Sequence, residues 1–270
     1  MSNAAQPIVS IVIATYRRLA RLKHCLGQVA RTVHVPHEVV VVDGGSDDGT
    51  PEWLATQPNV RLHVEQPRGG CCRAYNIGLQ MACGRYVMWL NDDAYPLPGA
   101  VENALRLLGR DDMRDVGLAA FYHTHPDPWN ELHAVEHQGR RYSVLHVRGY
   151  PYANFGLLRR TLLKQVGYLD EGYHFCAWDP DLSLKVQRQA ELKVLGVPDA
   201  LVYHEEHVDE RKEHDAGDVR TRDNERLFAK WSLPPKGGFP DPRPTYLDLL
   251  RSRGLIGQSM AATAAPHARV

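Results

Sequence analysis

Residues 85–93 read RYVMWLNDD and place two carboxylates directly after a short apolar run. The run at 86–90 has the length and composition of a strand buried on both faces of a parallel sheet. In open α/β sheets, ligands bind at the carboxyl ends of the strands, where an acidic pair can hold a divalent cation. We therefore interpret Asn91, Asp92 and Asp93 as part of a site for a metal ion and a diphosphate.

The first third of the chain alternates segments typical of strands and of helices. β-Branched or apolar runs indicate strands at residues 8–14, 39–42, 60–65 and 86–90. Helical spacing indicates helices at 19–33 and 73–83, and Thr50-Pro51-Glu52 supplies the cap, proline and acid that begin another near residue 50. Because strands joined by helices pair in parallel, we predict an α/β fold with a mostly parallel central sheet flanked by helices.

The second half of the sequence has a different character. Residues 123–150 are rich in His, Trp, Tyr and Pro, and Gln138-Gly139-Arg140 is typical of a hairpin turn. Further elements are predicted as helices from Pro98 and at 159–166, 180–189 and 218–231, and as strands at 116–122, 192–197 and 200–203. We expect a small antiparallel region beside the parallel sheet.

Composition excludes several classes of protein. The 270 residues include 32 Lys and Arg and 32 Asp and Glu, so the formal net charge is zero and we expect no nucleic-acid partner. Five cysteines, an odd number without paired CxxC spacing, favour a reducing, cytoplasmic compartment. No stretch approaches the roughly 18 uninterrupted apolar residues of a membrane span, and residues 1–7 lack the pattern of a signal peptide.

Six blocks of sequence carry a specific resemblance. In chain order they are VSIVIATYRR (9–18), VVVVDGGSDDGT (39–50), YNIG (75–78), WLNDD (89–93), GYLDEGYHFCAWDPDLSLK (167–185) and ALVYHEEH (200–207). Together they resemble glycosyltransferase family 2, which has the GT-A fold, from about Ile8 to His204. The resemblance implies transfer of a sugar from a nucleotide diphosphate donor to a hydroxyl acceptor, usually with inversion and assisted by Mn²⁺ or Mg²⁺.

On this resemblance we predict one GT-A catalytic domain at residues 1–232. Its nucleotide-binding half would span 1–97 and its acceptor half 98–232, followed by a C-terminal extension at 233–270 that ends in an Ala-rich tail with little to bury. The acceptor would belong to a polysaccharide, a glycolipid or another glycoconjugate. A lipid-linked acceptor would be met from the water side, at the inner face of the membrane, and oligomeric state is left open.

The nucleotide site is assigned by resemblance. Thr15, Tyr16 and Asp43 would form the base pocket with Arg17 beside them, and Asp43, at a strand end, can accept from the N–H of a pyrimidine, which favours a UDP-sugar. Alternatively, Asp43 closes a turn with Ser46.

Two further arginines are candidates for phosphate or base contacts. Arg68 lies in the loop before Gly69-Gly70. Many relatives carry an arginine where this chain has Tyr75, and Arg73 could replace it, although a surface salt bridge explains Arg73 equally well.

For the metal, the family pattern points to Asp93, with Asp92 near the ribose. Asn91 replaces a first acid, but such an ion takes only one or two protein carboxylates. His204, after the strand 200–203, would complete the metal shell, and its imidazole would favour Mn²⁺. The alternatives are that the acids cap the following helix and that His204 bonds to backbone.

The expected general base is Asp179, at the spacing where the family has an acidic pair. Trp178 replaces the first acid of that pair, and Asp181 is the alternative carboxylate. On the acceptor side, Trp129, Tyr152 and Asn154 with Trp178 would contact the sugar, unless the aromatic residues pack on the core.

Other interpretations of the chain are less well supported by its sequence. Four histidines at 123, 125, 133 and 137 lack the Cys or acid that would complete a tetrahedral zinc site. Nucleotidyl transfer would need a Gly-rich phosphate loop after the first strand, and Thr15-Tyr16-Arg17-Arg18 contains no glycine. A non-catalytic nucleotide-sugar-binding subunit is consistent with the departures at Asn91 and Trp178, and retaining transfer also uses this scaffold.

Overall fold

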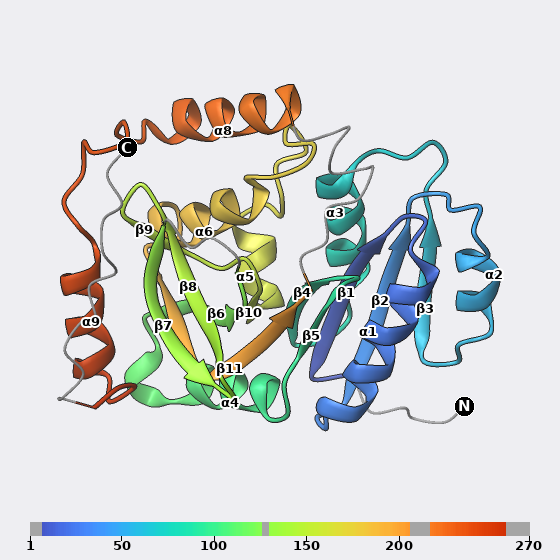
Figure 1. Ribbon diagram of the computed structural model, residues 1–270, viewed down its shortest axis with the longest axis horizontal. Coiled ribbons are helices and arrows are strands. Elements are labelled where there is room, and N and C mark those ends of the chain that lie inside the picture. The colour runs from blue at the N-terminus through green and yellow to red at the C-terminus, as the bar shows by residue number, and fades with distance from the viewer. Residues whose placement is uncertain (1–6, 126–129, 206–216, 258–270) are drawn as a thin grey trace.

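One mixed sheet forms the centre of the molecule (Figure 1). The computed structural model describes residues 7–125, 130–205 and 217–257. From one edge to the other the strands are β3 (Val60–Val64), β2 (His37–Asp43), β1 (Val9–Thr15), β4 (Tyr86–Asn91), β10 (Gly156–Arg159), β6 (Val116–His123), β11 (Lys193–His204) and β5 (Ala94–Pro96). A branch of β7 (Glu131–His137), β8 (Arg140–Val147) and β9 (Tyr150–Tyr152) joins at β6.

Strands β1 to β4 pair in parallel, which confirms the prediction for the first half. The alternating Val and Ile residues of β1 are buried on both faces, because helices cover the sheet from either side. In the register, Thr15 lies opposite Asp43, and Ala14 lies opposite Asn91. The carboxyl ends of β1, β2 and β4 therefore meet at one edge of the sheet.

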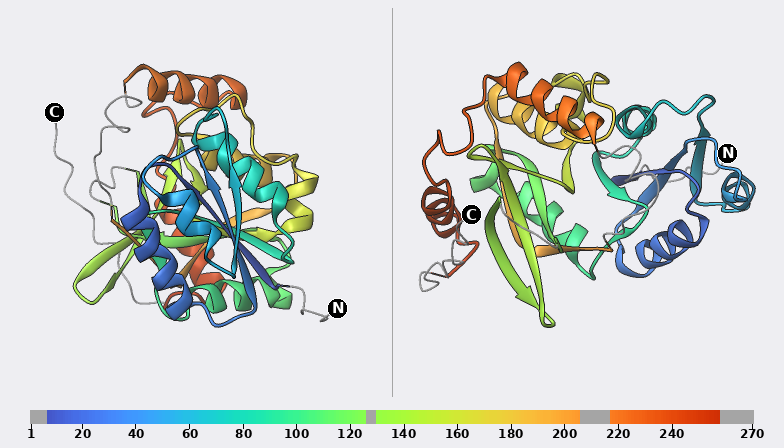
Figure 2. Two further views of the ribbon diagram at one scale, coloured as in Figure 1. Left: turned by 90° about the vertical axis from the view of Figure 1, so that its right-hand side faces the viewer. Right: turned by 45° about the horizontal axis from the view of Figure 1, so that its top comes forward.

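The helices of the first half lie on opposite faces of this sheet (Figure 2). α1 (Leu19–Thr32) and α2 (Thr50–Ala55) lie on one face, and α3 (Cys71–Met81) packs on β1 and β2 from the other. A Cβ added at Gly78 would lie 2.4 Å from a methyl group of Val12, so only glycine allows this close approach. This close packing fixes the distance between α3 and β1.

The second half adds helices around the antiparallel part. They are α4 (Ala100–Gly109), a 3₁₀ turn η1 (Asp111–Met113), α5 (Arg160–Gln165), α6 (Trp178–Arg188), α8 (Asp218–Trp231) and α9 (Arg243–Ser252). In Figure 1, α8 lies along α6, and α9 stands at the edge beside β7. The hairpin predicted at Gln138-Gly139 is confirmed, and both residues have positive φ.

The structure differs from the sequence prediction in several elements. β10 inserts antiparallel between β4 and β6, and the predicted strands at 192–197 and 200–203 are one strand, β11, with irregular register near Pro198. Helix α9 was not expected. It buries Tyr246, whose hydroxyl accepts the Gly196 N–H at 2.7 Å. Across the three described ranges, no helix combines the length and apolarity needed to cross a bilayer.

Candidate functional site

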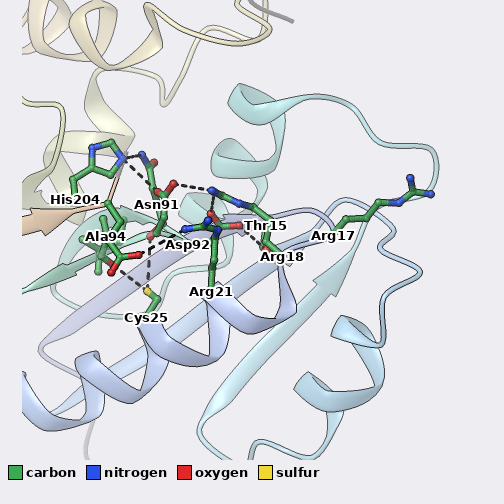
Figure 3. A network of polar contacts seen from close by, with 12 residues as sticks. Thr15, Arg17, Arg18, Arg21, Cys25, Asn91, Asp92, Ala94 and His204 are labelled. Carbon is green, nitrogen blue, oxygen red and sulfur yellow. Dashed lines mark hydrogen bonds and ion pairs between the residues drawn. The ribbon is translucent and has the colours of Figure 1, made fainter. Parts of the chain in front are cut away.

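The acidic pair lies where β4 leaves the sheet, beside the end of β1 (Figure 3). Thr15 Oγ1 donates to Asp92 Oδ2 at 2.8 Å. The Arg18 guanidinium donates to Asp92 Oδ1 through Nη1 and to Asp93 Oδ2 through Nη2 at 2.9 Å. All three charged side chains are at least 90% buried, so this is an internal ion pair. The acids do not cap α4, whose N-cap is Gly99.

His204 reaches the same acids from β11. Its Nε2 lies 3.3 Å from Asp93 Oδ1 and 3.2 Å from Asn91 Nδ2. The backbone of His204 is tied to Thr124, whose hydroxyl accepts the His204 N–H and donates to the His204 carbonyl, both at 2.9 Å. Burial alone would raise the pKa of Asp93, but His204 and Arg18 outweigh it and hold that pKa well below its usual range.

These residues fit a divalent cation of the Mg²⁺ or Mn²⁺ type. Two ligands about 2.1 Å from a metal and at right angles to each other lie about 3 Å apart, close to the separation of Asp93 Oδ1 and His204 Nε2. In the described part of the chain, no group of three His, Cys, Asp or Glu could hold a metal by itself. The protein therefore offers few ligands, and phosphate oxygens and water would have to supply the others.

Asp179 lies in the first turn of α6, after Ala177, a helix cap with φ of 66°. Burial raises the pKa of Asp179 from 3.8 to about 7. Its neighbour Asp181 is fully buried and accepts from the Tyr173 hydroxyl at 3.1 Å and from Trp231 Nε1 at 2.7 Å. Lys230 Nζ lies 2.8 Å from the same Asp181 oxygen. The contacts of Asp181 are structural, whereas Asp179 faces a cavity.

That cavity has a volume of about 270 Å³ and brings the two sets of acids together. Asp92, Asp93 and His204 line one part of it, and Asn154, Trp178 and Asp179 line another. A group that titrates near neutral pH therefore shares a cavity with a strongly acidic carboxylate and an imidazole. Such a constellation can take up a proton from a bound hydroxyl while a charged group is held nearby.

Comparison with known proteins identifies the family. The family model of glycosyl transferase family 2 matches residues 10–167 of this chain. The chain belongs to glycosyl transferase family 2. It is therefore a glycosyltransferase, as predicted. An uncharacterized glycosyltransferase of Rickettsia typhi is 27% identical over 85% of this chain and 72% of its own length, and one of Bacillus subtilis, YwdF, is 25% identical over 83% and 84%. A relative in Rickettsia prowazekii is covered over 62% of its length.

Solved structures support the same fold. The mannosyltransferase PcManGT from Pyrobaculum calidifontis, in complex with GDP-Man and Mn²⁺, superposes with a TM-score of 0.61 at 21% identity, covering 94% of this chain and 76% of that one. S. aureus TarS 1-349 in complex with UDP-GlcNAc gives 0.55 at 19% identity, covering 76% and 60%. The GT-A fold predicted from the sequence is confirmed.

In the glycosyltransferase, the residues expected at the base pocket are spread around the strand ends. Asp43 is fully buried and accepts from Gly45 N–H at 2.9 Å, Ser46 N–H at 2.7 Å and Ser46 Oγ at 2.6 Å. These are the turn-closing contacts of the alternative interpretation. Arg17 points away from the acidic pair and binds exposed Asp47 at 2.6 Å (Figure 3). A role for either residue in nucleotide binding stays a prediction.

Of the two other candidate arginines, Arg68 lines the cavity and Arg73 does not. The Arg68 guanidinium lies 4.5 Å from the centroid of the Tyr16 ring, and Arg68 lines the cavity. Arg73 is exposed, pairs with Glu65 at 3.2 Å and is not among the residues that line the cavity. The surface salt bridge considered for Arg73 is thus present.

On the acceptor side, Trp129 lies outside the described residues. Tyr152 belongs to β9, pairs with Leu145 and is not among the residues that line the cavity. The Asn154 carbonyl accepts from Trp89 Nε1 at 2.8 Å, and Trp178 is only 6% exposed. Of this set, Asn154 and Trp178 reach the cavity.

Sequence reasoning did not assign roles to Arg18, Tyr75 or Arg220, which also line the cavity. Arg18 stands in the TYRR block, but its side-chain direction depends on where α1 begins. Arg220 enters from α8, far along the chain, and no sequence signal places it here. His133, counted in the rejected zinc cluster, is bonded to the Tyr122 hydroxyl at 2.7 Å.

Proposed function

We propose that this glycosyltransferase transfers a sugar from a UDP-sugar to a hydroxyl acceptor, with inversion and with dependence on Mn²⁺ or Mg²⁺. The observation that carries the proposal is the single cavity lined by Asp93, His204 and Asp179. Inverting transfer needs a base on the face of the anomeric carbon opposite the leaving diphosphate. A cavity lined by these residues can hold the acceptor hydroxyl beside the base and the diphosphate beside the cation.

Asp93 and His204 are the residues that would hold the cation. Asp93 divides its carboxylate, with Oδ2 on Arg18 and Oδ1 facing His204 Nε2. A bound cation would supply Lewis-acid stabilisation of the charge that develops on the diphosphate. Arg18 donates to both acids, compensates their charge within the protein and helps to hold the pKa of Asp93 below its usual range.

Asp179 is the proposed general base. Its pKa of about 7 means that a large fraction is ionised at neutral pH, while the carboxylate remains basic enough to accept a hydroxyl proton. Removing the proton as the acceptor oxygen attacks would contribute ~10²- to 10⁴-fold in rate. Asp181 is occupied by contacts with Tyr173, Lys230 and Trp231, which supports Asp179 rather than Asp181 as the base.

The donor is proposed from the nucleotide side. Asp92, beside Thr15, would meet the ribose, and Tyr16, Asp43 and Arg68 would meet the base or phosphates. The solved neighbours differ in this respect, since one was captured with GDP-Man and another with UDP-GlcNAc. Uridine is proposed because a strand-end carboxylate such as Asp43 suits the N–H of a pyrimidine.

A donor panel tests the proposal. The enzyme is incubated with UDP- and GDP-sugars, with Mn²⁺ or with a chelator, and release of nucleotide diphosphate is measured together with the anomeric configuration of the product. We expect Mn²⁺-dependent release of UDP, lost in Asp93→Asn. Nucleotide binding without turnover for any donor or acceptor would favour the non-catalytic subunit, and full turnover in chelator would remove the metal from the proposal.

A further inference from the structure

A buried carboxylate of α8 binds the loop that leads to Asp179. Asp223 is 3% exposed, and its carboxylate accepts hydrogen bonds from three successive backbone N–H groups. Its Oδ2 lies 2.8 Å from the Phe175 nitrogen and 2.9 Å from the Cys176 nitrogen, and both of its oxygens lie 3.2 Å from the His174 nitrogen. Successive N–H groups that converge in this way form a concave site for an anion, and here the anion is the Asp223 carboxylate.

The same loop, residues 174–176, is also bound to α3. The His174 carbonyl accepts the Cys71 N–H at 3.1 Å. Gly70, which precedes Cys71, has a φ of 98°, and a Cβ added there would lie 3.1 Å from the His174 carbonyl oxygen. Glycine at this position allows both the positive φ and the close approach of the two backbones. The 174–176 loop is therefore held between α8 and α3.

The 174–176 loop leads directly into the helix turn that carries Asp179. Its last two residues line the cavity that Asp179 faces. Ala177 follows with a φ of 66° and caps α6, and Asp179 lies in the first turn of that helix. A non-glycine residue with positive φ is costly and persists only where the surrounding structure holds it. The contacts with Asp223 end one residue before Ala177, so they hold the chain where its direction changes.

A second set of contacts joins α8 to the segment before this loop. Asp170 pairs with Arg226 at 3.0 Å and with Lys230 at 2.8 Å. These ion pairs join side chains, whereas Asp223 binds the backbone of the 174–176 loop. The chain therefore offers two carboxylates that tie α8 to the same region, and only one of them holds the residues that lead to the proposed base.

We infer that Asp223 is a positioning residue that places the Asp179 carboxylate for proton transfer by holding the 174–176 loop. The inference rests on the proposed function, in which Asp179 is the general base. Asp223 is not among the residues that line the cavity, so it would act through Asp179 rather than on the substrate. A base must lie within hydrogen-bond reach of the proton that it removes, and a displacement of about 1 Å can cost ~10²-fold in rate.

The variant Asp223→Asn tests these contacts and keeps the shape of the side chain. Both Asp223 oxygens face the His174 N–H, so either orientation of the Asn amide places a donor against that donor. Turnover is measured as UDP release from the UDP-sugar that wild type uses, and we expect kcat per folded active site to fall about 10- to 100-fold. The affinity for UDP in Mn²⁺, measured by calorimetry, should stay unchanged.

Asp170→Asn is the matched control, because it weakens the other tie between α8 and the same region. It should lower the melting temperature and leave kcat per folded active site unchanged. The double variant Asp179→Asn/Asp223→Asn tests whether Asp223 acts through the base. If it does, the double variant should be no slower than Asp179→Asn alone, whereas independent effects would multiply.

The outcomes separate this inference from the proposed function. If Asp179→Asn loses turnover and Asp223→Asn keeps the wild-type kcat, Asp223 only stabilises the fold and the inference is overturned. If Asp179→Asn itself turns over like wild type, the proposed base fails first and the inference falls with it.

Hydrogen exchange in wild type tests the contacts even if Asp223→Asn does not fold. The amides of the 174–176 loop should exchange as slowly as those in the middle of α6, because the Asp223 carboxylate holds them. Rapid exchange of these amides in wild type would show that Asp223 does not hold the loop and would overturn the inference.

Discussion

Arg18 Nη2 donates to Asp93 Oδ2 at 2.9 Å, and both side chains are more than 90% buried. The same guanidinium reaches Asp92. The opposite oxygen of Asp93 faces His204 at 3.3 Å. Arg18 therefore fixes one side of Asp93 and leaves the other side directed at the imidazole, so that a cation could bind Oδ1 without displacing the arginine.

Replacing Arg18 by Met should uncouple stability from cation binding. Removing one partner of a buried ion pair typically costs 3–5 kcal/mol, so we expect the free energy of unfolding to fall by about that amount. Mn²⁺ should then raise the melting temperature more in the variant than in wild type, because it meets uncompensated acids. Thermal melts with and without Mn²⁺ measure both effects, and an equal Mn²⁺ shift in the two proteins would argue against the cation site.

Asp179→Asn should separate binding from chemistry. We expect kcat to fall ~10²- to 10⁴-fold with little change in the affinity for UDP and Mn²⁺. In wild type, kcat should rise with pH through about 7 and then level off, because only the ionised carboxylate accepts the proton. Steady-state rates across pH 5–9 check this, and a variant with wild-type turnover would exclude Asp179 as the base.

The raised pKa of Asp179 also predicts how stability depends on pH. The folded protein binds this proton more tightly than the unfolded chain, so the stabilisation is complete below pH about 4 and is lost as the pH rises through about 7. Asp179→Asn lacks this loss. The melting temperature of the variant relative to wild type should therefore be higher at pH 8 than at pH 4; a difference that stays constant with pH would show that burial does not perturb Asp179.

Replacing Asp181 should reduce stability and leave turnover largely intact. Because Tyr173, Lys230 and Trp231 all donate to Asp181, Asp181→Asn removes the charge that these donors meet and should cost about 1–3 kcal/mol, while Lys230 keeps its second partner Asp170. The folded fraction should retain turnover, measured per active site at a temperature well below the melting point. Complete loss of turnover with an unchanged melting temperature would reverse the assignment of the two carboxylates.

Much of the nucleotide half could be predicted from sequence. Buried parallel strands are apolar throughout, so the apolar run at 86–90 predicted a buried strand. The acids that follow it were therefore expected at the carboxyl end of that strand. β10 escaped prediction because four residues carry too little periodicity, and its antiparallel insertion is decided by packing between β4 and β6. α9 likewise depends on what Tyr246 meets in β11.

The site was less accessible to sequence reasoning. Asp179 and Asp181 stand two residues apart in the same helix turn. Asp181 is occupied by structural contacts from Tyr173 and from Lys230 and Trp231 of α8, a helix far along the chain. Tyr75 contacts both Asn91 and Trp178, so three segments that are distant in the sequence meet at the cavity. Such contacts follow from tertiary packing, which local patterns do not encode.

The most direct test of the proposed metal site is the position of Mn²⁺ in a crystal of the enzyme with UDP, located by the anomalous scattering of manganese. We expect one peak in direct contact with a carboxylate oxygen of Asp93 and with His204 Nε2, with the diphosphate in the same cavity that Asp179 faces. A manganese peak bound elsewhere, or a diphosphate outside that cavity, would contradict it.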